Sequence, residues 1–530
     1  MKLRLSKLFF ILILVVEIVV LMYFGTMKKG MHFDECFSYF NTNNSVGREA
    51  YDRSFVSSSD IMKDFYVKDG ERFNYSYVVK LQSFDVHPPL FYLLLHTLCS
   101  LFPNIFSMWF GLSLNILYAL ITSIFVFLIV KELTKSEYIA LGIMLIAAVN
   151  PGVISNVMYI RMYCLMTLFI MITVYLHIIM SEQSELNTLK NKYIIFNAVL
   201  AFLGFMTHYF YLAFIFFLEL GFWLPKIFKW KRNYKGFLKY FVAMLFAGIL
   251  GVVLYPACLG HVNSGYRGQE VRSYMLDFSD LGERMSFFIG LINDYIFDNF
   301  LYIILIAVVL LLLTSYYKMK KQEVFNNRIF VFIECIFVPT LGYFLVSAKG
   351  ALLGDVTMMR YQLPIYNLVI IGILLMLYGP LNYLIKNNNV KNMLFIFALV
   401  SFLIINVHGM LTSKVNYLYE NQEKMNEIAK EHKDEVCVYI YNDEANKYLL
   451  WNDFSELSQY KEVYFVLASN KDAIIEEKIN NASNMVVYVS SLNEYGDFDE
   501  YVKLIKDNNK NIKSYEKLYD AMYATAYEFY

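Results

Sequence analysis

The feature that most constrains this 530-residue chain is a series of long apolar runs within its first 410 residues. A helix needs roughly 17 to 25 mostly apolar residues to cross a bilayer, and about eleven runs reach or approach that length. The chain is 58% hydrophobic and only 17% charged, far more apolar than an average soluble protein. The sequence therefore predicts a polytopic α-helical membrane protein.

The predicted spans are joined by short connections, except where two longer polar segments intervene. They run over Leu8–Phe24, Ser107–Val130, Tyr138–Val157, Met162–Met180, Tyr193–Met206, Phe210–Leu224, Phe237–Tyr255, Phe300–Tyr317, Ile329–Val346, Leu363–Tyr383 and Leu394–Val407. Three glutamates fall within them, where an ionisable group is costly, and each either lines a substrate path or is a paired structural residue. These are Glu17, Glu219 and Glu334.

The distribution of basic residues predicts which side of the membrane each connection faces, because short cytoplasmic loops are enriched in Lys and Arg. If the N-terminus is cytoplasmic, every inner connection carries lysine, whereas the short outer ones carry far less basic charge, most of it arginine. We therefore expect a multi-pass protein of the cytoplasmic (plasma) membrane, with its N-terminus inside and its C-terminus outside. The outer arginines are Arg161, Arg267, Arg272, Arg284 and Arg360.

This orientation requires that residues 88–102 do not cross the membrane. The run is short, contains His96 and begins with two prolines, which suit the first turn of a helix. A helix lying at the outer interface accounts for it. Residues 27–87 then form a large first outer loop, and loops of this length usually have a function beyond connecting two spans. Spans, loop and interfacial helix together make up a predicted catalytic domain over residues 1–410.

Residues 411–530 have the composition of a small soluble domain outside the membrane. Short β-branched and aromatic runs at 436–441, 463–467 and 485–489 predict strands. Helix-compatible stretches, Glu444–Leu457 and Lys471–Asn480, lie between them. Strands that alternate with helices predict an α/β domain, and its lack of a glycine-rich phosphate motif argues against nucleotide binding.

The charge balance and the cysteines exclude some classes of function. Lys plus Arg and Asp plus Glu both number 46, so no net positive charge favours a nucleic-acid partner. The six cysteines are scattered without the spacing of a zinc site or a disulfide framework.

Two short polar segments stand out at the ends of the first outer loop. Asp34 and Glu35 follow the first span, where a carboxylate can accept a proton from an acceptor group or hold a divalent cation. A solvated acidic pair is the alternative. His87 lies in Asp-Val-His-Pro-Pro-Leu at 85–90, where two prolines fix the backbone beside it. A capping or packing role for this histidine is an equal alternative.

These segments, together with Arg161-Met-Tyr163 after the third span, resemble a known family. They are similar to the polyprenyl-phosphate-sugar-dependent glycosyltransferases of the protein O-mannosyltransferase and aminoarabinose transferase type (glycosyltransferase family 39-like), which have the GT-C membrane fold. The resemblance covers residues 1–210 by motif and the other spans by their order. It implies an inverting transfer of a hexose or pentose from a polyprenyl phosphate to a glycan, lipid or protein in the cell envelope.

The resemblance also implies roles for individual residues. Asp34 acts as the base on the acceptor or positions it, and Glu35 is its neighbour in the motif. Displacement at an anomeric carbon requires such a base and stabilisation of the departing phosphate on the other side. Arginine suits phosphate oxygens, although snorkelling to the interface is an equal alternative for each one. The candidate substrate-binding residues are His87, Arg161, Tyr163, His208, Arg267, Arg272, Lys349, Arg360 and Tyr361.

Several points stay open at this level. A structural hydrogen bond is the alternative for His208. A divalent cation (Mg²⁺ or Mn²⁺) at Asp34 and Glu35 is undecided, because two carboxylates are too few oxygen ligands to require one. The alternative functions are a transporter or flippase for a lipid-linked sugar, and a polysaccharide polymerase or ligase with a polyprenyl-diphosphate donor. Paired repeats and helices broken at the midplane are typical of transporters, and this sequence concentrates its polar motifs in the outer loops.

Overall fold

The computed structural model describes residues 2–43, 52–181, 189–227, 230–322, 327–441, 453–490 and 498–530. The chain forms two compact units. We call residues 1–25, 82–91 and 111–416 the membrane unit, and residues 26–81, 92–110 and 417–530 the sheet unit. The predicted catalytic domain contained the first outer loop, whereas most of that loop belongs to the sheet unit. The division into a domain of residues 1–410 and a domain of residues 411–530 stays a prediction.

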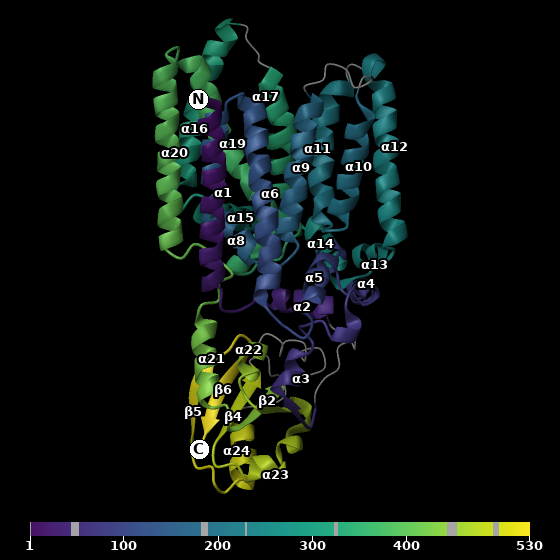
Figure 1. Cartoon of the computed structure of the whole chain (residues 1–530), viewed down its shortest axis with the longest axis vertical. Coiled ribbons are helices and arrows are strands. Elements are labelled where there is room, and N and C mark those ends of the chain that lie inside the picture. Colours follow the sequence, from purple (N-terminus) through teal and green to yellow (C-terminus); the bar gives the residue numbers. More distant parts are fainter. Residues whose placement is uncertain are drawn as a thin grey trace. The chain divides into compact units, whose positions relative to one another are not determined.

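The membrane unit is built of helices, and its long ones run side by side in Figure 1. Its elements, some of which extend across a unit boundary, are α1 (Lys2–Met27), α6 (Met108–Thr134), α7 (Glu137–Ala148), α8 (Pro151–Met158), α9 (Tyr163–Ser181), α10 (Asn191–Phe205), α11 (Phe210–Ile227), α12 (Trp230–Leu254), α13 (Ala257–Asn263), α14 (Tyr266–Leu276), α15 (Leu281–Tyr295), α16 (Leu301–Gln322), α17 (Asn327–Phe332), η3 (Ile333–Phe337), α18 (Val338–Gly350), η4 (Val356–Tyr361), η5 (Leu363–Ile365), α19 (Tyr366–Leu384) and α20 (Asn388–Leu411).

Eight helices among the described residues are long and apolar enough to cross a membrane, and the bent pair α7 and α8 makes a ninth if it is one span. This confirms a multi-pass helical membrane protein. Two shorter apolar helices, Asn191–Phe205 and Leu301–Tyr317, coincide with the two other predicted spans. The count of eleven and the orientation stay predictions. Residues 88–102 contain the twelve-residue helix α5 (Leu90–Leu101), which is shorter than a typical span.

The predicted span 138–157 is divided by a bend of 57° between α7 and α8. Pro151 occupies the first turn of α8, where its missing N–H costs nothing. The Asn150 side chain accepts from the N–H of Gly152 at 3.1 Å, and it donates to the side chain of Asn406 at 2.9 Å. Because Asn150 caps the new helix, its polar groups are satisfied within the protein.

Helices α11 and α18 approach each other closely because glycines face the contact. A Cβ atom added at Gly221 would lie 2.7 Å from the backbone oxygen of Glu334 in η3. One added at Gly342 would meet the ring of Phe217 at 2.1 Å. Element η3 is a turn of π-helix inside the span Arg328–Gly350.

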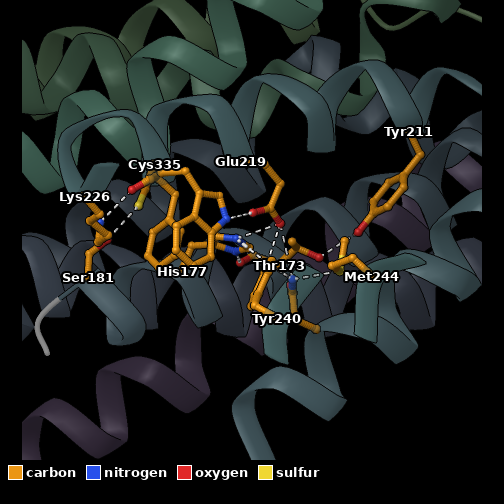
Figure 2. A network of polar contacts seen from close by, with 12 residues as sticks. Thr173, His177, Ser181, Tyr211, Glu219, Lys226, Tyr240, Met244 and Cys335 are labelled. Atoms are coloured by element: carbon orange, nitrogen blue, oxygen red, sulfur yellow. Dashed lines mark hydrogen bonds and ion pairs between the residues drawn. The ribbon is translucent and has the colours of Figure 1, made fainter. Parts of the chain in front are cut away.

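The glutamates inside the spans are paired with polar side chains of neighbouring helices. Glu219 of α11 accepts from Trp223 Nε1 at 3.0 Å and lies 3.3 Å from His177 Nε2 of α9, and Tyr240 of α12 also donates to it. Figure 2 shows this network, which continues to Tyr211 through Thr173. Ser181 and Lys226 contact Glu334 at 3.0 and 3.3 Å.

Glu17 of α1 completes the set, because Ser123 of α6 donates to it at 2.8 Å. Of the two readings that the sequence left open, these contacts favour paired structural residues. Each glutamate has at least one polar partner inside the protein, as a polar group in a span requires, although the second carboxylate oxygen of Glu17 is buried without one.

The sheet unit contains a six-stranded mixed sheet in the order β1-β3-β2-β4-β6-β5. Strand β2 is parallel to β3 and β4, and the other neighbours are antiparallel. The strands are β1 (Ser54–Ser57), β2 (Val436–Tyr441), β3 (Glu462–Leu467), β4 (Met485–Ser490), β5 (Tyr515–Asp520) and β6 (Ala524–Phe529). Its helices are α2 (Phe33–Asn43), α3 (Ser58–Met62), η1 (Asp69–Glu71), α4 (Tyr75–Ser83), α5, α21 (Asn421–Glu431), α22 (Phe454–Leu457), η7 (Ala468–Ile474), α23 (Glu477–Asn480) and α24 (Phe498–Asn508).

The three predicted strands are confirmed as β2, β3 and β4. The predicted helix Lys471–Asn480 is two elements, because Glu476 caps a new helix by accepting from the N–H of Lys478 at 2.7 Å. Of the predicted helix Glu444–Leu457, residues 444–452 lie outside the described part of the chain, and 454–457 form α22. Strand β1 comes from the first outer loop and pairs with β3. This pairing explains why most of that loop belongs to the sheet unit and not to the membrane unit, as the predicted domains had it.

We predict that Gly221→Ala destabilises the membrane unit. The added methyl group meets a backbone oxygen that no side-chain rotation can move, and overpacking of this kind costs about 1–3 kcal/mol. Gly248→Ala in α12 is the matched control, because a Cβ there meets nothing within 4 Å and the helix gains about 1 kcal/mol. Thermal melting of the purified protein in detergent should move in opposite directions for the two variants. Equal melting temperatures would contradict the close contact.

Candidate functional site

The first polar segment identified from the sequence forms the start of α2 in the sheet unit. Asp34 and Glu35 lie in the first turn of this helix, where carboxylates are favoured by the helix dipole. The backbone N–H groups of Glu35 and Cys36 both donate to the carbonyl of His32, which closes the turn. Local structure therefore fixes both carboxylates, but their environments differ.

Glu35 is completely buried and forms an ion pair with Lys28, whose Nζ lies 3.0 Å from each carboxylate oxygen. The backbone N–H of His32 also donates to Glu35, at 2.6 Å, and Lys28 donates to the carbonyl of Tyr417 at 2.7 Å. Burial lowers the pKa of Lys28, and the charge of Glu35 opposes that shift. With its hydrogen bonds made inside the protein, Glu35 is a structural anchor for the start of α2.

Asp34 remains partly exposed, with 23% of its side-chain surface accessible. Its Oδ2 lies 3.7 Å from Nδ1 of His32, and its backbone N–H donates to the same nitrogen at 3.1 Å. A ring nitrogen that accepts this hydrogen bond carries no proton, so these contacts describe a neutral imidazole. Of the two acidic residues, Asp34 is the one that a substrate can reach.

The second segment belongs to the membrane unit and meets residues from two other connections. Arg161 Nη2 lies 3.4 Å from His87 Nδ1. The rings of His87 and His208 are 5.6 Å apart, and those of Tyr163 and His208 are 5.3 Å apart. We call these four residues, His87, Arg161, Tyr163 and His208, the arginine–histidine cluster. All four were candidates from the sequence, although they are spread over more than 120 positions.

Backbone contacts hold the cluster in place. The N–H of Leu90 donates to the carbonyl of Met206 at 3.0 Å, which ties the Pro-Pro segment to the end of α10. The Tyr255 hydroxyl lies 3.4 Å from the carbonyl of His87, and Asp85 Oδ2 lies 3.4 Å from His87 Nδ1. The prolines therefore fix a backbone that the rest of the unit also restrains.

The cluster contains one permanent positive charge. Arg161 is buried and always charged. Burial lowers the pKa of His208 well below its usual range, and the charges of His87 and Arg161 act in the same direction. His208 is therefore neutral at physiological pH, and one of its ring nitrogens can donate a hydrogen bond.

Three further candidate residues, Arg360 and Tyr361 of η4 and Arg267 of α14, also belong to the membrane unit. The Phe210 ring, 5.4 Å from His208, lies 6.0 Å from the ring of Tyr361. The guanidinium of the buried residue Arg360 lies 5.3 Å from the centre of the same tyrosine ring. Arg267 of α14 pairs with Glu270 at 2.7 Å.

Two predicted residues have surroundings that differ from those of a phosphate ligand. Lys349 is buried, forms an ion pair with Asp280 at 3.2 Å and donates to the carbonyl of Asp277. Arg284 binds the same aspartate at 2.5 Å. Arg272 is exposed on α14. Lys349 of α18 is thus engaged by the connection between α14 and α15, while Arg272 is exposed.

Sequence reasoning missed Lys28, His32, Asp85 and Tyr255, which position the candidates. One signal was present for Lys28: a lysine directly after the first span lies on the predicted outer side, against the bias of lysine toward the cytoplasm. No local pattern indicated Tyr255, because its contact with His87 joins segments 168 residues apart.

One group among the described residues has the spacing of metal ligands: His432, Glu435 and Glu528, whose ligand atoms lie within 4.8 Å of one another. His432 Nδ1 lies 3.1 Å from Glu435 and 3.9 Å from Glu528, so these are also the contacts of a histidine between two carboxylates. At α2, both oxygens of Glu35 are engaged by Lys28. A cation bound by Glu35 would have to displace that ammonium group.

Comparison with known proteins bears on the fold. No protein-family model and no curated protein matches the sequence. Among solved structures, the chain shares the fold of membrane glycosyltransferases of the GT-C type. The crystal structure of ArnT from Cupriavidus metallidurans bound to undecaprenyl phosphate aligns with a TM-score of 0.52 over 98% of this chain and 97% of that chain, at 9% identity. At that identity the likeness shows the fold, and it confirms the predicted fold class.

Two further structures align with lower scores. ArnT from the same organism in the apo state has a TM-score of 0.44 at 10% identity and covers 93% of this chain and 96% of that chain. The Archaeoglobus fulgidus oligosaccharyltransferase tethered with an acceptor peptide has a TM-score of 0.43 at 10% identity. Its alignment covers 96% of this chain and 69% of that chain.

The lowered pKa of His208 predicts an acid-sensitive membrane unit. A histidine in an unfolded chain has a pKa near 6.5. Below that pH, His208 binds a proton in the unfolded chain but not in the folded one. Stability should therefore fall by up to about 1.4 kcal/mol for each pH unit below 6.5 and be constant above it. Thermal melting between pH 5 and 8 measures this effect, and His208→Gln should flatten the curve. An unchanged curve in that variant would assign the acid sensitivity to other groups.

Proposed function

We propose that this protein is an inverting glycosyltransferase that moves a monosaccharide from a polyprenyl phosphate to an acceptor outside the cytoplasm. The observation that carries the proposal is the contrast between the two carboxylates of α2. Glu35 is buried and neutralised by Lys28, whereas Asp34 stands partly exposed beside a histidine. A base must be accessible to its substrate, and Asp34 meets that condition.

The reaction assigns a task to each group of side chains. The acceptor hydroxyl or amide forms a bond to the anomeric carbon, the bond from that carbon to the phosphate oxygen breaks, and Asp34 takes the acceptor proton. The leaving lipid phosphate gains negative charge as the bond breaks. Arg161 supplies positive charge and N–H donors for it, His87 can donate one hydrogen bond from its ring, and the planar guanidinium suits two phosphate oxygens.

The remaining residues have supporting roles in this proposal. Glu35 and Lys28 position the turn that carries Asp34, so Glu35 is a positioning residue. His208 and Tyr163, whose rings are 5.3 Å apart, complete the cluster, and Arg360 beside Tyr361 is a second buried cation of the membrane unit. Lys349 and Arg272 act on the donor only if the segment 266–284 rearranges, because Lys349 is paired with Asp280.

The fold supports the proposal. The ArnT structure with the same fold contains undecaprenyl phosphate, a polyprenyl phosphate. We infer that the present chain uses a donor of the same lipid class and lies in the plasma membrane with its sheet unit outside. A flippase for lipid-linked sugars would move the lipid without forming a glycosidic product, and a polymerase or ligase would prefer a diphosphate donor. Sugar transfer from a monophosphate donor in the assay below would favour our reading over both.

Changing Asp34 to Asn should lower the transfer rate by about 10² to 10⁴-fold, the usual contribution of general base catalysis. The purified enzyme, a panel of undecaprenyl-phosphate monosaccharides and a membrane extract as acceptor source allow the release of undecaprenyl phosphate to be measured. Asp60→Asn, which removes an exposed carboxylate of the same unit, is the control and should leave the rate unchanged. Full activity of Asp34→Asn would remove Asp34 from the mechanism.

We expect transfer to continue at an unchanged rate in excess chelator. The buried ammonium group of Lys28 already supplies the positive charge beside Glu35, and a divalent cation would need several oxygen ligands. The same assay after dialysis against a chelator, with and without added Mg²⁺ or Mn²⁺, tests this expectation. Loss of transfer that either metal restores would show that a cation is bound at Asp34 or elsewhere.

A further inference from the structure

The membrane unit contains a pocket whose lining residues lie outside the arginine–histidine cluster. It has a volume of about 650 Å³ and lies among α6, α16, α17 with η3, and α19. The end of α6, the later part of α16, the beginning of α17 and the end of α19 all line it. These are the helix ends predicted to face the cytoplasm, whereas α9 and α11 begin at the cluster on the opposite side.

One part of this pocket is apolar and open to the surroundings of the protein. Leu312 of α16, Ile333 and Phe337 of η3 line it with 42%, 41% and 44% of their surfaces exposed. Arg328 and Phe337 lie nine residues apart on one continuous span, which corresponds to about 13 Å along a helix. An apolar cavity of that depth in a membrane protein fits a hydrocarbon chain.

The other part carries positive charge. Arg328 lines the pocket at the start of α17, and Asn382 lines it near the end of α19. Lys391 at the start of α20 donates to the Asn382 side chain at 3.0 Å, which brings a second cation to the same end. The hydroxyls of Thr134 and Ser315 donate to carbonyls of their own helices at 2.7 and 2.9 Å. None of the described residues that line the pocket is acidic.

From this combination we propose that the pocket binds one acidic glycerophospholipid of the surrounding leaflet. Its phosphodiester contacts Arg328 and Lys391, and one acyl chain lies against Leu312, Ile333 and Phe337. Arginine and lysine at the end of a span recognise the phosphate, and the apolar side chains bury the tail. The proposal does not depend on the proposed transferase activity, because it concerns binding at another site.

The test uses the whole protein purified in detergent and mixed with equal amounts of phosphatidylglycerol and phosphatidylcholine. Native mass spectrometry counts the lipid that stays bound. The wild type should retain about one phosphatidylglycerol and prefer it several-fold, because the choline ammonium offsets the phosphate charge in phosphatidylcholine, and each cation near a net anionic lipid contributes about a fivefold factor. Arg328→Gln with Lys391→Gln should remove the preference, while thermal melting reports that the variant is folded.

A second pair of variants tests the location of the acyl chain. Leu312→Trp places a larger side chain in the pocket and should reduce retained phosphatidylglycerol about fivefold or more. Leu310→Trp is the matched control, because Leu310 lies on the same helix with 58% of its surface exposed and does not line the pocket. Equal binding of the two lipids by the wild type, or equal retention by the two tryptophan variants, would overturn the proposal. If Leu312→Trp fails to fold, the charge variant decides.

Discussion

In the hydrocarbon core of a bilayer no water is present to satisfy a polar side chain, so each such group must find its partners inside the protein. The network around Glu219 meets this requirement with side chains from α9, α10, α11 and α12. The same helices lead to the arginine–histidine cluster: α9 begins with Tyr163, and the connection between α10 and α11 carries His208. Packing that satisfies the glutamate therefore also fixes the spacing of the residues at the other end of these helices.

Burial, more than residue type, separates the roles of neighbouring charged residues. Asp34 and Glu35 are adjacent in the sequence and chemically alike, but one is buried with Lys28 and the other is accessible. A buried charge pair is costly to break because removing one partner leaves the other unpaired, which makes this pair a firm support for the turn. The same reasoning separates Arg161 in the cluster from Lys349, whose charge is matched by Asp280.

The two basic regions of the membrane unit place the same type of side chain in different surroundings. At the cluster, Arg161 is buried and its Nη2 lies 3.4 Å from Nδ1 of His87. At the pocket among α6, α16, α17 and α19, Arg328 is exposed next to an open apolar cavity. The first environment suits a reacting phosphate that is shielded from water, and the second suits a lipid that remains in the bilayer.

The sequence by itself determined the features that depend on local pattern. The lengths of the apolar runs predicted the helices of the membrane unit, and β-branched runs predicted β2, β3 and β4, because hydrophobicity and strand propensity act over a few neighbouring residues. The Asp34-Glu35 pair and the His87 segment were also recognisable from their local motifs. Only the tertiary structure decided that β1 pairs with β3, more than 400 residues later. It likewise decided that Lys28 neutralises Glu35 and that Lys349 pairs with Asp280. These outcomes depend on burial and on contacts between distant segments, which a local pattern does not contain.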